Sequence, residues 1–104
     1  MAKKQTKIDD PDRVLRFGVA LGNELRIAVL LAHANDGAAS ATMLANDGIG
    51  TLGNVSYHQV KLRNLGALKL VGSRQRKGAT ERHYDLTDFG AEIVKTAVMI
   101  GRRR

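Results

Sequence analysis

Three polar side chains stand within four positions of this sequence, at Asn54, Ser56 and Tyr57. An asparagine amide presents a donor and an acceptor side by side and can pair with adenine through two hydrogen bonds, while hydroxyl groups can reach base edges or phosphates. A helix over residues 52–65 would place these side chains on one polar face, opposite core residues such as Val55. We therefore expect DNA contacts here, with an ordinary solvated helix face as the alternative. The candidate contacts are Thr51, Gly53, Asn54, Ser56, Tyr57 and Lys61.

A strongly basic segment overlaps and follows this polar stretch. The chain of 104 residues has 17 Lys and Arg against 10 Asp and Glu, a net charge of +7. Residues 60–83 contain seven of the basic residues and a single Glu, and so supply most of the excess. Such residues can neutralise phosphates or enter a narrow minor groove, although a charge run can also be a solvated face. The candidate phosphate contacts are Arg74, Arg76, Lys77 and Arg82.

Two weaker signals concern phosphate binding. Ser40 and Thr51 each stand at an expected helix start, where a hydroxyl group and free N–H groups can bind a phosphate or simply cap the helix. Residues 48–53 spell G-x-G-x-x-G, but a dinucleotide site needs a preceding strand and an acidic residue about twenty positions later. A helix is expected before this stretch, and no Asp or Glu occurs between Asp47 and Glu81. We therefore do not expect nucleotide binding.

The residue types do not support catalysis or a metal site. The absence of cysteine excludes disulfides, thiolate zinc sites and thiol nucleophiles. The three histidines, His33, His58 and His83, are far apart in the sequence, and their acidic neighbours do not complete a four-ligand set. No serine has the sequence context of an activated nucleophile. We expect no enzyme activity, no cofactor and no metal, and we expect His58 to be half-buried and hydrogen-bonded.

The elements that would position these residues are mainly helical. After an arm over residues 1–10, expected to be flexible, Pro11 between two aspartates marks a helix start, and Asn23 can cap a second, largely apolar helix that ends at Gly37. Ser40 can cap a short third helix that ends at Asn46. The fourth helix, over residues 52–65, ends at Gly66.

After the fourth helix, the spacing of apolar residues changes from a helical period to the alternation of a strand. Residues 68–75 and 80–86 alternate as strands around a basic tip at residues 76–79, with Tyr84 facing inward, and Thr87 can cap a last helix. The expected fold is mainly α with a β-hairpin, in the order α-α-α-α-β-β-α. This is a winged helix-turn-helix domain over residues 11–100, followed by a basic tail over residues 101–104.

Four stretches, residues 21–27, 52–58, 62–66 and 76–84, resemble the ArsR-like winged-helix transcriptional regulators, and the similarity extends over residues 12–100. The wing is similar to a subset that is common in actinobacterial sequences. The resemblance implies that the fourth helix enters the major groove, that the wing lies along the backbone, and that the first and last helices build a homodimer. The candidate interface residues, which form apolar seams, are Val14, Phe17, Leu21, Phe89, Ile93, Ala97 and Ile100.

The chain departs from that family's pattern at two adjacent positions. Gln59 stands where leucine is usual, and Val60 stands where a basic or polar residue is usual. Either the helix is rotated locally or Gln59 is hydrogen-bonded beneath the wing. The family's metal sensors use cysteines or His/Asp clusters on the terminal helices, and the lack of cysteine here argues against metal sensing.

These observations predict a sequence-specific regulator that binds double-stranded DNA as a homodimer, with repression as the default mechanism. The alternatives are an architectural protein that binds DNA by charge alone, aided by Arg102–Arg104, or a protein-interaction module. The longest apolar run, residues 27–32, is far too short to span a membrane, and no N-terminal signal is visible. A cytoplasmic, nucleoid-associated location is therefore expected. The sequence does not identify an effector ligand.

Overall fold

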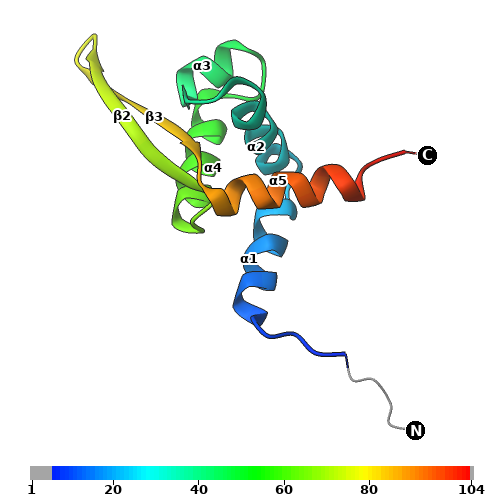
Figure 1. Ribbon diagram of the computed structural model, residues 1–104. Helices are drawn as coiled ribbons and strands as arrows, with labels where there is room; N and C mark the ends of the chain where they lie inside the picture. The colour runs from blue at the N-terminus through cyan, green and yellow to red at the C-terminus, as the bar shows by residue number, and fades with distance from the viewer. Residues whose placement is uncertain (1–5, 104) are drawn as a thin grey trace, which may run out of the picture.

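The computed structural model describes residues 6–103, and within them it contains five helices and three strands (Figure 1). The helices are α1 (Pro11–Leu21), α2 (Glu24–Asp36), α3 (Ala41–Asn46), α4 (Leu52–Asn64) and α5 (Asp88–Ile100). The strands are β1 (Ala39–Ser40), β2 (Leu68–Arg76) and β3 (Ala79–Leu86). This order confirms the predicted winged helix-turn-helix fold. The predicted arm and tail lie partly outside the described residues, and residues 6–10 precede α1 without regular structure.

Every helix begins at a polar N-cap residue whose side chain accepts the N–H of the residue three positions later, an interaction that contributes about 1 kcal/mol. The predicted caps at Asn23, Ser40 and Thr87 are confirmed, and Asp10 and Thr51 cap the other two helices. The helix starts were therefore predictable from local sequence.

The end of α4 is set by Gly66, as predicted. Gly66 has φ +85°, and its N–H donates to the Arg63 carbonyl while the Ala67 N–H donates to the Leu62 carbonyl. This pair of bonds is the Schellman arrangement, which satisfies carbonyls that would otherwise be free at the helix end. The chain then turns directly into β2.

The sheet is antiparallel and has the order β1-β3-β2. The sequence predicted only the two long strands. The third, β1, has two residues, pairs Ala39 with Tyr84, and is too short to show a periodic pattern.

The wing turn is also tighter than predicted, because the strands extend to Arg76 and Ala79. Lys77 (φ +49°) and Gly78 (φ +78°) form a two-residue turn of the kind that matches strand twist.

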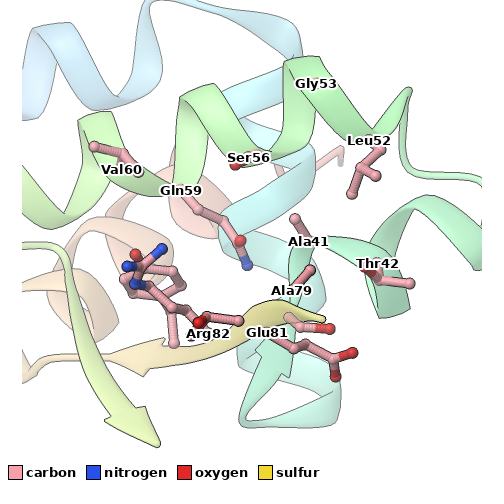
Figure 2. A pocket seen from close by; sticks show the side chains of 13 residues that line it. Ala41, Thr42, Leu52, Gly53, Ser56, Gln59, Val60, Ala79, Glu81 and Arg82 are labelled. Carbon is pink, nitrogen blue, oxygen red and sulfur yellow. The ribbon is translucent and has the colours of Figure 1, made fainter. Parts of the chain in front are cut away.

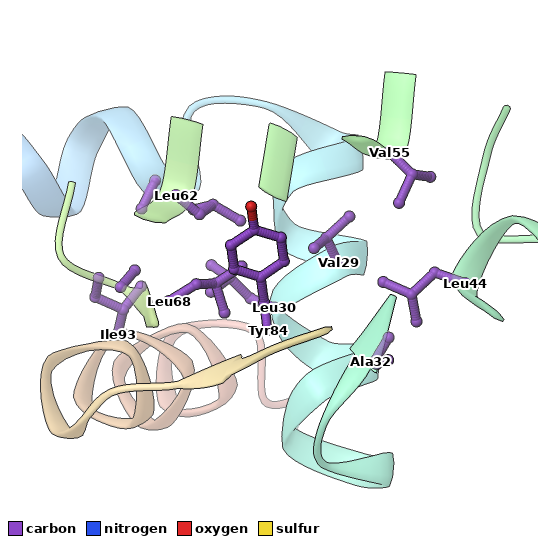
Figure 3. Close-up of a cluster of buried hydrophobic side chains, with 12 residues drawn as sticks. Val29, Leu30, Ala32, Leu44, Val55, Leu62, Leu68, Tyr84 and Ile93 are labelled. Atoms are coloured by element: carbon purple, nitrogen blue, oxygen red, sulfur yellow. The ribbon is translucent and has the colours of Figure 1, made fainter. Parts of the chain in front are cut away.

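The core lies where α2, α4, α5 and the base of the hairpin meet, as Figure 3 shows. Helix α2 crosses its centre, as its apolar character predicted, and Tyr84 of β3 points inward. Helix α5 lies very close to the backbone at the start of β2. A Cβ on Gly90 would lie 2.1 Å from the Ala67 carbonyl oxygen, so α5 can approach this closely only with glycine there. The largest side chains that are fully buried are Leu30, Leu44, Leu62, Leu68, Ile93, His33 and Gln59.

Helix α1 packs on α5 and α2 at one side of the molecule (Figure 1). The rings of Phe17 and Phe89 meet edge to face with centroids 5.3 Å apart, and the Arg13 guanidinium lies 4.8 Å from the centre of the Phe89 ring. Arg13 also forms an ion pair with Glu92 of α5. None of the helices within residues 6–103 is long and apolar enough to cross a membrane.

Candidate nucleic-acid interface

Helix α4 has the two faces that the sequence predicted. Val55 and Leu62 are fully buried against the core, while Gly53, Asn54, Ser56 and Tyr57 are exposed, and Tyr57 is 60% exposed. The polar candidates therefore lie on the outside of a helix whose other side is held by the core. Their side chains are free to meet a large ligand.

Lys61, the last candidate on α4, is half-buried beside Tyr57. Its Nζ lies 5.9 Å from the centre of the Tyr57 ring, within range of a cation–π interaction. Lys61 therefore lies on the flank of the exposed face and places a positive charge next to Tyr57.

The two hydroxyl candidates at helix starts differ in exposure. Thr51 is exposed, and its Oγ1 accepts the Asn54 N–H at the start of α4. Ser40 is only 2% exposed, lies within the short strand β1, and uses its Oγ to accept the Met43 N–H. The Ser40 hydroxyl therefore caps α3, while Ser40 also lines an open surface groove, and a phosphate contact there stays a prediction.

The departure at Gln59 is explained by a buried hydrogen-bond network. Gln59 is 1% exposed, and its Nε2 lies 3.2 Å from His33 Nε2 and 3.3 Å from the Ala39 carbonyl. His33 Nδ1 in turn lies 3.0 Å from the Gly37 carbonyl. One tautomer satisfies all three contacts: His33 donates from Nδ1 to Gly37 and accepts at Nε2 from Gln59. Gln59 thus ties α4 to α2 and β1.

Burial lowers the pKa of His33 below its ordinary value of 6.5, because the charged ring would lose its hydration. The Gly37 carbonyl and Asp85 oppose this effect less strongly. The neutral ring is also the form that the Gln59 contact requires. Protonation of His33 and the hydrogen bond from Gln59 therefore exclude each other.

His58 is half-buried, as expected, and its Nδ1 lies 3.5 Å from the Arg26 guanidinium. The pKa of His58 is lowered by burial first, then by the nearby charges of Arg26 and Lys61. Arg26 also donates through Nε to the Val19 carbonyl at 2.9 Å. The Arg26 side chain, which belongs to α2, therefore contacts both the end of α1 and the middle of α4.

All four predicted wing residues, Arg74, Arg76, Lys77 and Arg82, are exposed along the hairpin. One acidic side chain lies among them. The Glu81 carboxylate is within 3.8 Å of Arg74 Nε, 3.6 Å of Arg76 Nη1 and 3.1 Å of His83 Nε2. Sequence reasoning missed this cluster, because Glu81 is seven residues from Arg74 and becomes its neighbour only through the strand register.

An open groove joins part of α4 to the wing (Figure 2). Gly53 and Ser56 line it from α4, Thr42 lines it from α3, and Glu81 and Arg82 line it from β3. The structure thus brings two of the α4 candidates and one wing candidate to the same surface hollow. Asn54, Tyr57, Arg74 and Lys77 are not among the residues that line it.

The predicted interface residues do not all lie on the surface. Ile93 is 0% exposed and packs inside its own chain, so it offers nothing to a second copy, and that part of the prediction is wrong. Phe17, Leu21, Phe89 and Ala97 are half-buried, whereas Val14 and Ile100 are 52% and 75% exposed. Sequence reasoning thus mixed inward and outward residues of the two helices, and its interface candidates left out four exposed apolar residues, Leu15, Val19, Val98 and Met99.

Residues 48–51 lie in the connection between α3 and α4, and residues 52–53 begin α4, so this stretch follows a helix and not a strand. Gly48 has φ +83° and allows the chain to reverse, and a Cβ on Gly50 would lie 3.1 Å from Leu25. The glycines therefore serve this turn. Within the described residues 6–103, no three His, Asp or Glu side chains gather closely enough to hold a metal ion.

The elements and their packing define a winged helix-turn-helix fold, with α3 and α4 as the helix-turn-helix and β2–β3 as the wing. Solved structures share this fold. The AntR antimony-specific transcriptional repressor superposes with a TM-score of 0.68 and 19% identity, over 94% of this chain and 86% of AntR. Mb0332 from Mycobacterium bovis superposes with a TM-score of 0.66 and 20% identity, over 94% of this chain and 90% of the Mb0332 fragment.

The Mb0332 fragment is described as a homodimeric winged helix-turn-helix DNA-binding domain of a possible ArsR-family transcriptional regulator. No protein-family model matches the sequence of the present chain, and no curated protein sequence matches it. At these identities the likeness establishes the fold, and the function has to be argued from the surface.

Proposed function

We propose that this protein is a transcriptional regulator that binds double-stranded DNA, with α4 in the major groove and the wing on the adjacent backbone. The observation that carries the proposal is that the exposed polar side of α4 and the basic hairpin border one open groove, which Ser56 lines from α4 and Arg82 lines from β3. The α4 side offers amide and hydroxyl groups for base edges, and the wing offers guanidinium groups for phosphates. A solvated helix face alone does not account for this pairing.

We further propose that the protein acts as a homodimer through the exposed apolar residues of α1 and α5. Leu15 of α1 and Met99 of α5 are 68% and 62% exposed, which is unfavourable for a monomer of this size. Mb0332, which shares the fold, is described as homodimeric. A two-fold dimer would recognise half-sites about 10 bp apart.

Repression by exclusion of RNA polymerase is the simplest regulatory outcome of such binding, in the cytoplasm and without enzyme activity of the protein itself. AntR, with the same fold, is described as an antimony-specific repressor. The lack of cysteine in the present chain removes thiolate ligands, so we do not extend metal sensing to it.

The test is a selection of bound duplexes from a random pool, followed by titration of a selected and a scrambled duplex. We expect at least tenfold preference for the selected duplex. Asn54→Ala should reduce that preference by roughly tenfold, because one bidentate base contact contributes about 1–3 kcal/mol. Asn64→Ala is the matched control, since Asn64 is an exposed asparagine at the far end of the same helix.

Three results would contradict sequence-specific DNA binding through α4. Equal affinity and equal salt dependence for both duplexes would mean binding by charge alone, as an architectural protein does. No duplex binding even at low salt would leave the protein-interaction module as the remaining interpretation. An equal loss in Asn54→Ala and Asn64→Ala would mean that α4 does not read bases through Asn54.

A further inference from the structure

Glu81 is an acidic residue in the middle of the basic wing, and its side chain is only 8% exposed. The two arginines beside it are much more open, at 62% for Arg74 and 58% for Arg76. The carboxylate is therefore covered while the guanidinium groups that flank it remain at the surface.

The strand register creates this cluster. Arg74 stands directly opposite Glu81 in the β2–β3 ladder, and Arg76 lies two residues further along the same strand, on the same face. His83, two residues from Glu81 on β3, shares that face as well. Three basic side chains thus converge on one carboxylate.

The three contacts are not equivalent. The Arg74 and Arg76 nitrogens lie 3.8 and 3.6 Å from the carboxylate oxygens, beyond the usual 2.7–3.2 Å range of an N–H···O bond. The His83 Nε2 lies 3.1 Å from Oε1, within that range. The arginines are thus held loosely and can turn toward another anion. When they do, the His83 ring remains beside the carboxylate, with Nε2 3.1 Å from Oε1, so Glu81 keeps a polar neighbour.

We propose that Glu81 is an intramolecular competitor of DNA phosphate for Arg74 and Arg76, an inference that rests on the proposed function. In the free protein the carboxylate neutralises part of the wing and holds both guanidinium groups along the hairpin. On the duplex, phosphate oxygens take its place. Glu81 thereby weakens backbone binding to DNA of every sequence, and so limits occupancy of non-specific sites.

The test compares Glu81→Gln with Glu92→Gln. Both variants remove one negative charge from a side chain that pairs with arginine, but Glu92 lies on α5 and pairs with Arg13 of α1. We expect Glu81→Gln to bind the duplex about three- to tenfold more tightly, with a salt dependence steeper by about one to two phosphate contacts. The gain should be the same for a selected and a scrambled duplex, because phosphates carry no sequence information. Glu81→Ala, which removes the charge by truncation, should act in the same direction.

Elution of the same variants from a heparin column provides a readout that does not depend on DNA recognition. If the unaltered protein binds the duplex but Glu81→Gln gains no more than Glu92→Gln, the proposal about Glu81 is overturned and the proposed function stands. If no variant binds the duplex but Glu81→Gln elutes at higher salt than Glu92→Gln, the proposed function is overturned, and what stands is that Glu81 competes with the anionic groups of a polyanion for the wing arginines. A gain confined to one duplex sequence, or no difference in either assay, overturns the proposal.

Discussion

Gln59 is the residue that most directly connects the interior of this protein to its proposed reading helix. Its amide lies within hydrogen-bond distance of His33 of α2 and the Ala39 carbonyl of β1, and both the amide and the imidazole are 1% exposed. Together with the buried side chains of Val55 and Leu62, the network holds α4 in one rotation about its own axis. It therefore determines which side chains of α4 point outward.

Replacement of Gln59 by leucine tests that role. Leucine fits the apolar surroundings but donates nothing, so His33 Nε2 and the Ala39 carbonyl would lose their partner. We expect Gln59→Leu to lower the free energy of unfolding by about 1–3 kcal/mol in urea denaturation. Asn64→Ala, an exposed change on the same helix, should stay within about 0.5 kcal/mol. An unchanged stability in Gln59→Leu would show that the network contributes nothing.

The lowered pKa of His33 makes stability depend on pH. Above about pH 6.5 the ring is neutral in both the folded and the unfolded chain, and the network is fully present. As the pH falls from 6.5 toward the lower pKa of the folded state, the unfolded chain binds the proton more readily, so stability decreases. Urea denaturation at pH 8, 6 and 5 measures this loss. The pKa of His58 is lowered as well, so both histidines contribute to this loss. His33→Gln should remove more of it than His58→Gln, because His33 is almost fully buried and His58 only half-buried; the reverse order would contradict the assignment to His33.

At the scale of the elements, the contact between α5 and the start of β2 holds the last helix against the hairpin. The N–H of Thr87 donates to the Ala67 carbonyl, and Gly90 passes directly over the same carbonyl. Glycine is normally unfavourable inside a helix. No local sequence pattern shows that Gly90 is needed here, because the Ala67 carbonyl that it passes over lies far from it in the sequence.

The corresponding prediction concerns two glycines in helices. Gly90→Ala should lower the free energy of unfolding by about 1–3 kcal/mol, because backbone has to move to admit the methyl group. Gly18→Ala, in α1 with open space around the position, should raise it by about 0.5–1 kcal/mol. Thermal denaturation of both variants provides the comparison. Equal effects of the two substitutions would show that helix propensity alone governs both sites.

At the scale of the whole molecule, the wing and the outward faces of α1 and α5 lie at different sides of the core (Figure 1). In the proposed homodimer, this separation would leave the proposed DNA surface free. The outward apolar residues of these helices, such as Leu15 and Met99, are exposed in the single chain, whereas Ala20 of α1 and Ile93 of α5 belong to its core.

Charge placed in this apolar surface should separate the two copies. We expect Leu15→Asp to sediment as a monomer at tens of micromolar, where the unaltered protein sediments as a dimer, because burial of an unpaired carboxylate is costly. Leu52→Asp is the control, since Leu52 is 53% exposed but belongs to α4. A monomeric unaltered protein, or a Leu15→Asp variant that remains dimeric, would contradict this interface.

The local signals in the sequence were sufficient for the helix starts, the end of α4, the two long strands and the polar side of α4. Each depends on residues within a few positions of one another, such as Thr87 and Gly90 or Leu62 and Ala67, and neighbours along the chain cannot avoid meeting. The basic character of the wing was likewise visible in composition alone.

Only the tertiary structure decided the rest. The strand β1, the Gln59–His33 pair, the Glu81 cluster and the burial of Ile93 and Ser40 all depend on residues that the sequence separates and the fold joins. Periodicity shows that a helix has an apolar stripe, but the stripe faces either the chain's own core or a partner. Packing of the whole chain makes that choice, since the core fills with the side chains that reach it and leaves the others outside.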